Sequence, residues 1–409
     1  MSTGYRLAAT WGEGESVQLT LGVDLRYLKQ ELEESQFRDQ DFGFLIVRTQ
    51  FDQLIPRSHS SNPGLFFESV IPRGDRLVFR SGARFDWAST NLEGDPQTRQ
   101  VQTYEPPLFP PVTNTVNLRD TLGAQHFTLA SVYGTAQYEV DCHWTALAGL
   151  GYAGRPPTLT ELYAEGPFMP LLQQGRNFVF GDPQLQQEQL LQIDVGVKAD
   201  YGPLRAGVNG FYAWVHDYIT MELGSAQPAL QTRRLTFVNT DLATLSGGEL
   251  YVEYDYNRRL TPFARMSFVE GRDHTRDDRP ASFRQTSIPL RDPTLPSPGD
   301  EEPLPGIAPL ESRLGLRLHE PAEKPRWGIE LAARVVDNQD RVATSLLEKP
   351  TPGFTTYDLR SYWQATDSLL LLAGVENFTD KQYQEHLDLR TGLGVFQPGV
   401  NFYFGIELS

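Results

Sequence analysis

The sequence has little cysteine and no long apolar run, and both shortages exclude classes of protein. Cys142 is the only cysteine, so the chain cannot form an internal disulfide. We expect Cys142 to be a turn residue with no partner for a cysteine-based metal site. Only 39% of the 409 residues are hydrophobic, and no run of about eighteen apolar residues occurs, which excludes a membrane-spanning helix. A spanning barrel is not excluded, because each strand needs only about ten residues of alternating polarity.

Positive charge and catalytic motifs are also scarce. Lys and Arg number 36 against 52 Asp and Glu, which gives a net charge of −16. Nucleic-acid binding requires clustered basic residues, and none are evident, so we expect no nucleic-acid partner. There is no glycine-rich phosphate loop, no His-Glu-x-x-His and no Gly-x-Ser-x-Gly. We therefore expect no enzymatic activity, no catalytic residues and no bound cofactor or metal.

A secretory signal is missing from the N-terminus. The first residues, MSTGYRLAATWGEGE, lack the charged region, apolar region and small-residue cleavage site of such a signal. Taken alone this argues against export. If the rest of the chain indicates an outer-membrane protein, truncation is the expected explanation.

Alternating polarity is the dominant pattern of the chain. In LQIDVGVKADYGPLRAGVNGFYAWV, residues 191 to 215, apolar residues occupy every second position, the pattern breaks at Tyr201-Gly202-Pro203, and it then resumes. Period-two alternation places successive side chains on opposite faces of a strand, and the short break predicts a hairpin. About fourteen segments of this kind recur, each of ten to fourteen residues, which is the length that a tilted strand needs to cross a bilayer.

The connections between these segments alternate between short and long. Short ones include residues 71–75, 139–143 and 201–203, whereas long ones are expected at residues 30–64, 89–124, 154–189, 217–245, 273–307, 337–353 and 379–398. In an antiparallel meander every second connection lies at the same end, so one end carries tight turns and the other long loops. Transmembrane barrels have this asymmetry. A soluble secreted β protein, such as a propeller or carbohydrate-binding fold, is the alternative.

Two segments resemble the signature of TonB-dependent outer-membrane receptors. The first contains Arg-x-Pro-Thr-x-x-Glu-Leu-Tyr followed by Gly-Asp-Pro-x-Leu-x-x-Glu, and the second, near the C-terminus, matches Asn-Leu-Thr-Asp-x-x-Tyr. The resemblance is dense in motifs from about residue 150 onward and covers residues 10 to 409. The matching positions are Arg155, Pro157, Thr158, Glu161, Leu162, Tyr163, Gly181, Asp182, Pro183, Leu185, Glu188, Asn377, Phe378, Thr379, Asp380 and Tyr383.

The resemblance implies an all-β fold, a transmembrane antiparallel up-and-down barrel of about twenty-two strands that encloses an N-terminal plug. About fourteen of those strands are expected here, in residues 17–409, after a poorly defined segment, residues 1–16. The plug and the TonB-binding box are then absent, so the chain is expected to be the C-terminal part of the barrel. A complete smaller barrel is the alternative, because even numbers near fourteen also close.

The resemblance further implies a location in the outer membrane of a Gram-negative-type bacterium, with membrane lipid and, for the full-length protein, the TonB complex as partners. The function implied is uptake of a scarce small-molecule ligand, such as a ferric siderophore or cobalamin. Haem is disfavoured, because no His lies between Arg155 and Pro183 to serve as an axial ligand. Loop residues Tyr163, Phe168, Arg176, Tyr383 and Arg390 are candidate ligand contacts. A passive porin-like or structural barrel without TonB coupling is the alternative function.

Overall fold

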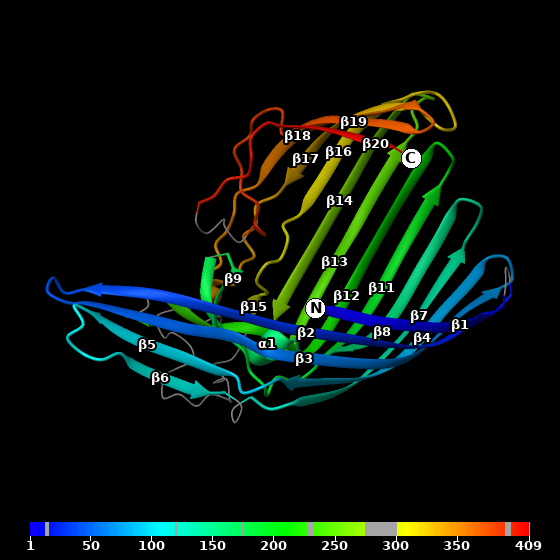
Figure 1. The fold of residues 1–409 in the computed structure, drawn as a ribbon. Coiled ribbons are helices and arrows are strands. Elements are labelled where there is room, and N and C mark those ends of the chain that lie inside the picture. The colour runs from blue at the N-terminus through cyan, green and yellow to red at the C-terminus, as the bar shows by residue number, and fades with distance from the viewer. Residues whose placement is uncertain are drawn as a thin grey trace.

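Strand follows strand through almost the whole chain (Figure 1). The computed structural model describes residues 1–12, 16–118, 122–173, 175–227, 232–274, 301–388 and 394–408. Within them, fifteen strands form a meander in which each pairs antiparallel with the next. They are β1 (Ser2–Trp11), β2 (Gln18–Asp41), β3 (Ile46–Arg73), β4 (Leu77–Leu92), β7 (Gln125–Glu139), β8 (Trp144–Arg155), β11 (Glu188–Asp200), β12 (Leu204–Gln227), β13 (Thr232–Tyr254), β14 (Leu260–Asp273), β16 (Glu311–His319), β17 (Trp327–Val336), β18 (Phe354–Thr366), β19 (Leu369–Glu376) and β20 (Asn401–Leu408).

The meander curves into the wall of a barrel (Figure 1). This confirms the predicted all-β, antiparallel up-and-down architecture, with one strand more than the fourteen expected. The additional strand is β1, which pairs with β2 along its whole length and lies in the segment expected to be poorly defined. Across the described residues no ladder joins β1 to β20, so these two strands are the edges of the sheet.

The described part of the chain contains no helix that is both long and apolar enough to span a bilayer.

One face of the sheet is apolar, and none of the described residues packs against it. On β11 the side chains of Leu191, Ile193 and Val195 are 41%, 43% and 59% exposed, although each lies in the middle of a paired strand. Neighbouring strands continue the same face with residues that include Val23, Leu150, Val208, Leu250, Leu316, Leu331 and Leu359. A face of this size is costly in water and requires an apolar surrounding, which lipid supplies.

The opposite face carries a chain of ion pairs that crosses adjacent strands. Arg317 on β16 donates to Glu253 on β13 at 3.0 Å and to Glu330 on β17 at 2.9 Å. Arg313 joins Glu330 at 3.0 Å to Asp358 on β18 at 3.5 Å. Charged side chains at this density require water or opposite charge, and both are available on the inner face of a barrel.

Exposed aromatic side chains gather where the strands meet the short turns. They lie on β7, β8, the turn after β11, β13 and β18, and they are Tyr138, Trp144, Tyr201, Tyr254 and Trp363. An aromatic side chain has an apolar body and a polar tip, which suits the border between acyl chains and headgroups. At the short-turn end, the apolar face therefore ends in aromatic side chains of the kind that lie at the surface of a bilayer.

The long connections all leave the other end of the sheet, as predicted, but two of them are not irregular loops. Residues 30–64 and 217–245 were expected to be loops, whereas β2 and β3 continue as a ladder to the tip at residues 42–45, and β12 and β13 run for 24 and 23 residues. A span needs about ten residues, so roughly a dozen residues of β2, about 40 Å, project beyond it. In the outer part of β2, from Glu31 to Asp41, the side chains on both faces are exposed or half-buried. This part of the sequence therefore lacks the apolar alternation that marks a membrane strand.

The remaining long connections hold short elements of their own. A hairpin of β5 (Gln97–Glu105) and β6 (Val112–Asn117) pairs with β3. Between β8 and β11 lie α1 (Leu159–Tyr163), β9 (Glu165–Leu172) and β10 (Gly175–Phe180), and β10 forms a short parallel ladder with β13. The connection from β14 to β16 contains β15 (Glu302–Pro303), and that from β17 to β18 contains the 3₁₀ helix η1 (Thr344–Leu346).

Candidate binding site at the loop end

A hydrophobic core lies at the loop end, outside the apolar band of the sheet. Side chains from several connections and from the projecting strands bury one another there, and Leu162, Tyr163, Val179 and Leu235 are completely buried. The core consists of Ile55, Leu118, Leu122, Leu159, Leu162, Tyr163, Ala164, Leu172, Val179, Leu185, Ile219, Leu223, Leu235, Phe237, Ala343 and Leu346. Burial on this scale fixes the connections relative to one another. We call this set the loop-end core.

Arg155, the first motif residue, joins three elements at the rim of the sheet. It ends β8, and its guanidinium donates to Glu188 at the start of β11 at 2.5 Å and to Glu161 of α1 at 3.1 Å. Glu188 in turn accepts the backbone N–H of Ile219 at 2.8 Å. Charge-assisted bonds of this kind are stronger than neutral ones. Arg155 therefore holds the connection that contains α1 against the ends of β8 and β11.

The helix α1 is a single turn closed by its own sequence. Thr158 is the N-cap, its hydroxyl accepts the N–H of Glu161 at 3.2 Å, and the Glu161 carboxylate accepts the N–H of Thr158 at 2.6 Å. This is a capping box. Pro157 precedes the cap and is buried. The helix ends at Tyr163, whose hydroxyl lies 2.6 Å from that of Thr90 on β4 and donates to the carbonyl of Gly123 at 3.0 Å.

Gly181 allows the second part of the motif to pass directly over α1. A Cβ at Gly181 would lie 2.5 Å from the carbonyl carbon of Leu162 and 2.6 Å from the N of Tyr163, and both are backbone atoms. The N–H of Asp182 donates to the carbonyl of Glu161 at 2.8 Å. Pro183 and Leu185 are buried behind this contact. The motif residues therefore form a folding unit, and their side chains are used for structure.

The C-terminal motif forms a second structural unit. Asn377 has a positive φ of 49°, its amide nitrogen donates to the carbonyl of Lys381 at 2.9 Å, and its backbone N–H donates to Asp358 at 3.1 Å. Asp380 also has a positive φ, of 53°, and its N–H donates to the carbonyl of Asn377 at 2.9 Å. The ring of Tyr383 packs on Phe354 with 4.2 Å between centroids. These contacts fix the start of the connection between β19 and β20.

The candidate ligand contacts are only partly placed. Tyr163 is buried in the loop-end core, so it presents no face to a ligand. Tyr383 is half-buried, with its ring packed on Phe354. Arg390 lies outside the described residues, and so do the side chains of Phe168 and Arg176.

A buried hydrogen-bonded pair that sequence reasoning missed joins three long connections. His386, in the last connection, lies 3.2 Å from the carboxylate of Glu348 in the connection before β18. Glu348 also accepts the N–H of Ala343 at 2.7 Å and that of Gly306, which follows β15, at 2.8 Å. Burial alone raises the pKa of Glu348, but the hydrogen bonds from His386 and the two N–H groups outweigh it, so this pKa lies below its usual value. The carboxylate is therefore charged at neutral pH.

An acidic hollow lies beside the base of the projecting β2–β3 hairpin. It has a volume of about 630 Å³ and is lined by carboxylates that outnumber the guanidiniums of Arg57 and Arg99. The carboxylates are Glu31, Glu33, Glu34, Asp52, Glu93 and Asp95. Lys29 forms an ion pair with Glu93, which lowers the pKa of Glu93. The hollow therefore attracts cations and repels anions at neutral pH.

The candidate metal ligands among the described residues lie at the opposite end. Asp141, Cys142 and His143 form the turn between β7 and β8, and they are the group whose donor atoms have metal-ligand spacing. Cys142 is a turn residue, as predicted. From the sequence no partner was expected for a cysteine-based metal site, and in the structure its Sγ lies 3.1 Å from Nδ1 of His143. Adjacency of a thiol and an imidazole in the sequence was the available signal.

Comparison with protein families identifies the barrel. A family model described as "TonB dependent receptor-like, beta-barrel" matches residues 2–378. The comparison with curated protein sequences gave no match.

Solved structures share the fold over most or all of this chain. The copper transporter OprC is similar with a TM-score of 0.69 and 24% identity, over 100% of this chain and 56% of that one. A double mutant of the Serratia marcescens hemophore receptor HasR, in complex with its hemophore HasA and heme, gives 0.57 and 15%, over 100% and 65%. The ferric yersiniabactin uptake receptor FyuA from Yersinia pestis gives 0.53 and 14%, over 94% and 49%. The chain spans about half the length of OprC.

Proposed function

Because the chain belongs to the TonB-dependent receptor β-barrel family, whose members lie in the Gram-negative outer membrane, we propose that it is part of an uptake receptor for a scarce ligand that contains a metal. A ferric siderophore or cobalamin is the ligand class, and the TonB complex supplies the energy in the full-length protein. Of the structurally similar proteins named above, OprC is a copper transporter, FyuA is an uptake receptor for ferric yersiniabactin, and HasR is a hemophore receptor in complex with its hemophore and heme.

The observation that carries this proposal is the folded state of the loop end. The loop-end core and the Glu348–His386 pair hold the long connections in one arrangement. A passive channel gains nothing from fixed loops, whereas a receptor requires them, because preorganised contacts reduce the entropy lost when a ligand binds. Phe168, Arg176, Tyr383 and Arg390 remain proposed ligand contacts.

The negative charge of the acidic hollow restricts the charge of the ligands that can bind there. Six carboxylates face two guanidiniums there, so we propose that the ligand arrives with a neutral or positive surface. An anionic chelate would be repelled at the hollow.

Ligand binding to the full chain in detergent tests the proposal. Ferric siderophores of positive, zero and negative net charge, and cyanocobalamin, are titrated while tryptophan fluorescence is followed. We expect saturable binding of at least one neutral or cationic ligand. Glu33→Lys reverses one charge in the hollow and changes the energy of a unit cation about 8 Å away by about 1 kcal/mol, which is about fivefold in affinity.

Asp75→Lys is the matched control, because it makes the same charge change in a short turn at the other end of the sheet. It should leave affinity unchanged. If none of the ligands binds and the chain gives unselective conductance in planar bilayers, the passive porin-like function is the better description.

A further inference from the structure

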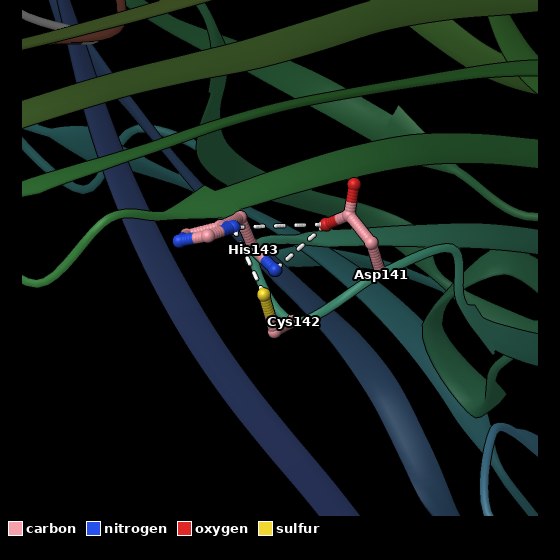
Figure 2. A group of neighbouring side chains, drawn as sticks. All are labelled: Asp141, Cys142 and His143. Carbon is pink, nitrogen blue, oxygen red and sulfur yellow. Dashed lines mark hydrogen bonds and ion pairs between the residues drawn. The ribbon is translucent and has the colours of Figure 1, made fainter.

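The turn between β7 and β8 brings together three different metal-ligating groups. Asp141, Cys142 and His143 are exposed at the short-turn end, and Figure 2 shows their side chains gathered on one side of the turn. One ligand atom of each lies within 4.8 Å of the others. Short turns of this family face the periplasm, so the group is separated by the membrane from the loop end where the uptake ligand is captured.

The distances between donor atoms fit a tetrahedral ion. The Sγ of Cys142 lies 3.1 Å from Nδ1 of His143, which lies 4.0 Å from Oδ1 of Asp141. Zinc bonds of about 2.3 Å to sulfur and about 2.0 Å to nitrogen or oxygen place S and N about 3.6 Å apart and N and O about 3.4 Å apart. Each pair therefore needs to move by only about half an ångström. Exposed side chains achieve this by small rotations.

The neighbouring turn holds the imidazole in place. The ring of His143 stacks on Tyr201, with 4.3 Å between centroids and 17° between planes. The hydroxyl of Tyr201 accepts the indole N–H of Trp144 at 2.8 Å, and the carbonyl of His143 accepts the N–H of Asp200 at 2.8 Å. A clamped imidazole loses little entropy when it ligates an ion.

The carboxylate of Asp141 is held in place. Its Oδ1 accepts the backbone N–H groups of His143 at 2.7 Å and Trp144 at 2.9 Å. These two hydrogen bonds fix the position of this oxygen donor.

We propose that Asp141, Cys142 and His143 bind a thiophilic transition-metal ion of the Zn²⁺ class at the periplasmic face of the barrel. Thiolate and imidazole select such an ion over Mg²⁺ or Ca²⁺, which take oxygen ligands. Three protein ligands leave the fourth tetrahedral position to water, as in an accessible site.

Alkylation of the single cysteine measures this site directly. Because the chain contains one cysteine, the rate at which iodoacetamide labels the full reduced chain in detergent reports Cys142 alone. We expect saturating Zn²⁺ to slow labelling at least tenfold, because the metal-bound thiolate is no longer a free nucleophile. Mg²⁺ should leave the rate unchanged. Equal rates with and without Zn²⁺ would overturn the proposal.

Variants separate the three-ligand site from weak binding by scattered histidines. His143→Ala and Asp141→Asn should each weaken Zn²⁺ protection at least tenfold, whereas His126→Ala, which removes an exposed imidazole on β7, should not. Co²⁺ provides a second readout, because thiolate ligation produces a near-ultraviolet charge-transfer band that Cys142→Ser must abolish. A band that survives in Cys142→Ser, or protection that survives in His143→Ala, refutes the assigned ligands. The unfolding midpoint of each variant checks that the barrel is intact.

Discussion

Two adjacent residues on β14 test the assignment of the faces at a single depth. Met266 belongs to the apolar face, is 41% exposed and pairs with Leu250 on β13 and Ser312 on β16. Ser267 points to the other face and lies in register between Glu249 and Glu311. Met266 is the seventh residue of β14. It lies about 20 Å along the strand from the first residue and about 15 Å along the membrane normal at a tilt of about 40°. In an apolar band about 25 Å tall, both residues lie near the midplane.

Met266→Arg should therefore cost about 2–4 kcal/mol of folding free energy, because a guanidinium at the midplane must be drawn from water into lipid. This reduces the folding equilibrium constant by a factor of about 30 to several hundred. Ser267→Arg should change it by less than about 1 kcal/mol, since two carboxylates flank that position. Denaturant titration of the full chain in lipid vesicles, followed by tryptophan fluorescence, measures both. Equal penalties, or a larger penalty for Ser267→Arg, would refute the assignment of Leu250 and its neighbours to lipid.

Three further predictions concern the contacts that hold the barrel and its loops. Gly181→Ala should destabilise the loop-end core by about 1–3 kcal/mol, because the added Cβ would overlap the backbone of α1. Gly134→Ala is the control and should be tolerated, because there is open space around Gly134; equal unfolding midpoints for the two variants would contradict the prediction. Glu330→Gln should cost about 1–2 kcal/mol by weakening two bonds from Arg313 and Arg317, against less than about 0.5 kcal/mol for Glu323→Gln in an exposed turn. The pKa of Glu348 is lower in the folded protein than in the unfolded chain, so the ionised carboxylate stabilises the fold fully above about pH 4.5, and this stabilisation is lost as the pH falls through the folded pKa. Proteolysis of the loop end of the natural chain should therefore accelerate in that pH range. The Glu348→Gln variant should be cleaved at one rate throughout.

The sequence predicts the membrane part of the fold well because lipid imposes a simple rule. Each strand must present apolar side chains at every second position to the bilayer, and this period is legible in any ten-residue window, as at Leu191, Ile193 and Val195. It also fixes which connections are short. Residues 2–11 escaped this reasoning although Tyr5, Leu7 and Trp11 of β1 are exposed apolar side chains, because a single strand at a chain end has no flanking turn on one side to define it.

Beyond the bilayer the rule no longer applies, and prediction becomes weaker for a physical reason. The outer part of β2 has exposed or half-buried side chains on both faces, so its sequence, QELEESQFRDQD, pairs through the backbone without an apolar stripe. The motif residues are recognisable in the sequence, but the sequence does not show whether their side chains serve folding or ligand binding. Only the short distances of Gly181 and Arg155 to the backbone and carboxylates around α1 show that this group is structural.

The two polar clusters differ in how far apart their members lie in the chain, and this difference decides what sequence reasoning can find. Glu348 and His386 are 38 residues apart, and nothing local to either indicates the other, since their contact depends on how two long connections fold over the barrel. Asp141, Cys142 and His143 are consecutive, so any tight turn places their donor atoms near one another, and the alternation of the flanking strands already predicts that turn. What the sequence alone does not supply is the clamp on the imidazole, because Tyr201 reaches His143 only through the pairing of β8 with β11. We expect Tyr201→Ala to weaken the protection of Cys142 by Zn²⁺ while leaving the unfolding midpoint unchanged. This result would show that the turn after β11 contributes to the metal affinity through the stacking contact, so that the site depends on strand pairing as well as on the tripeptide.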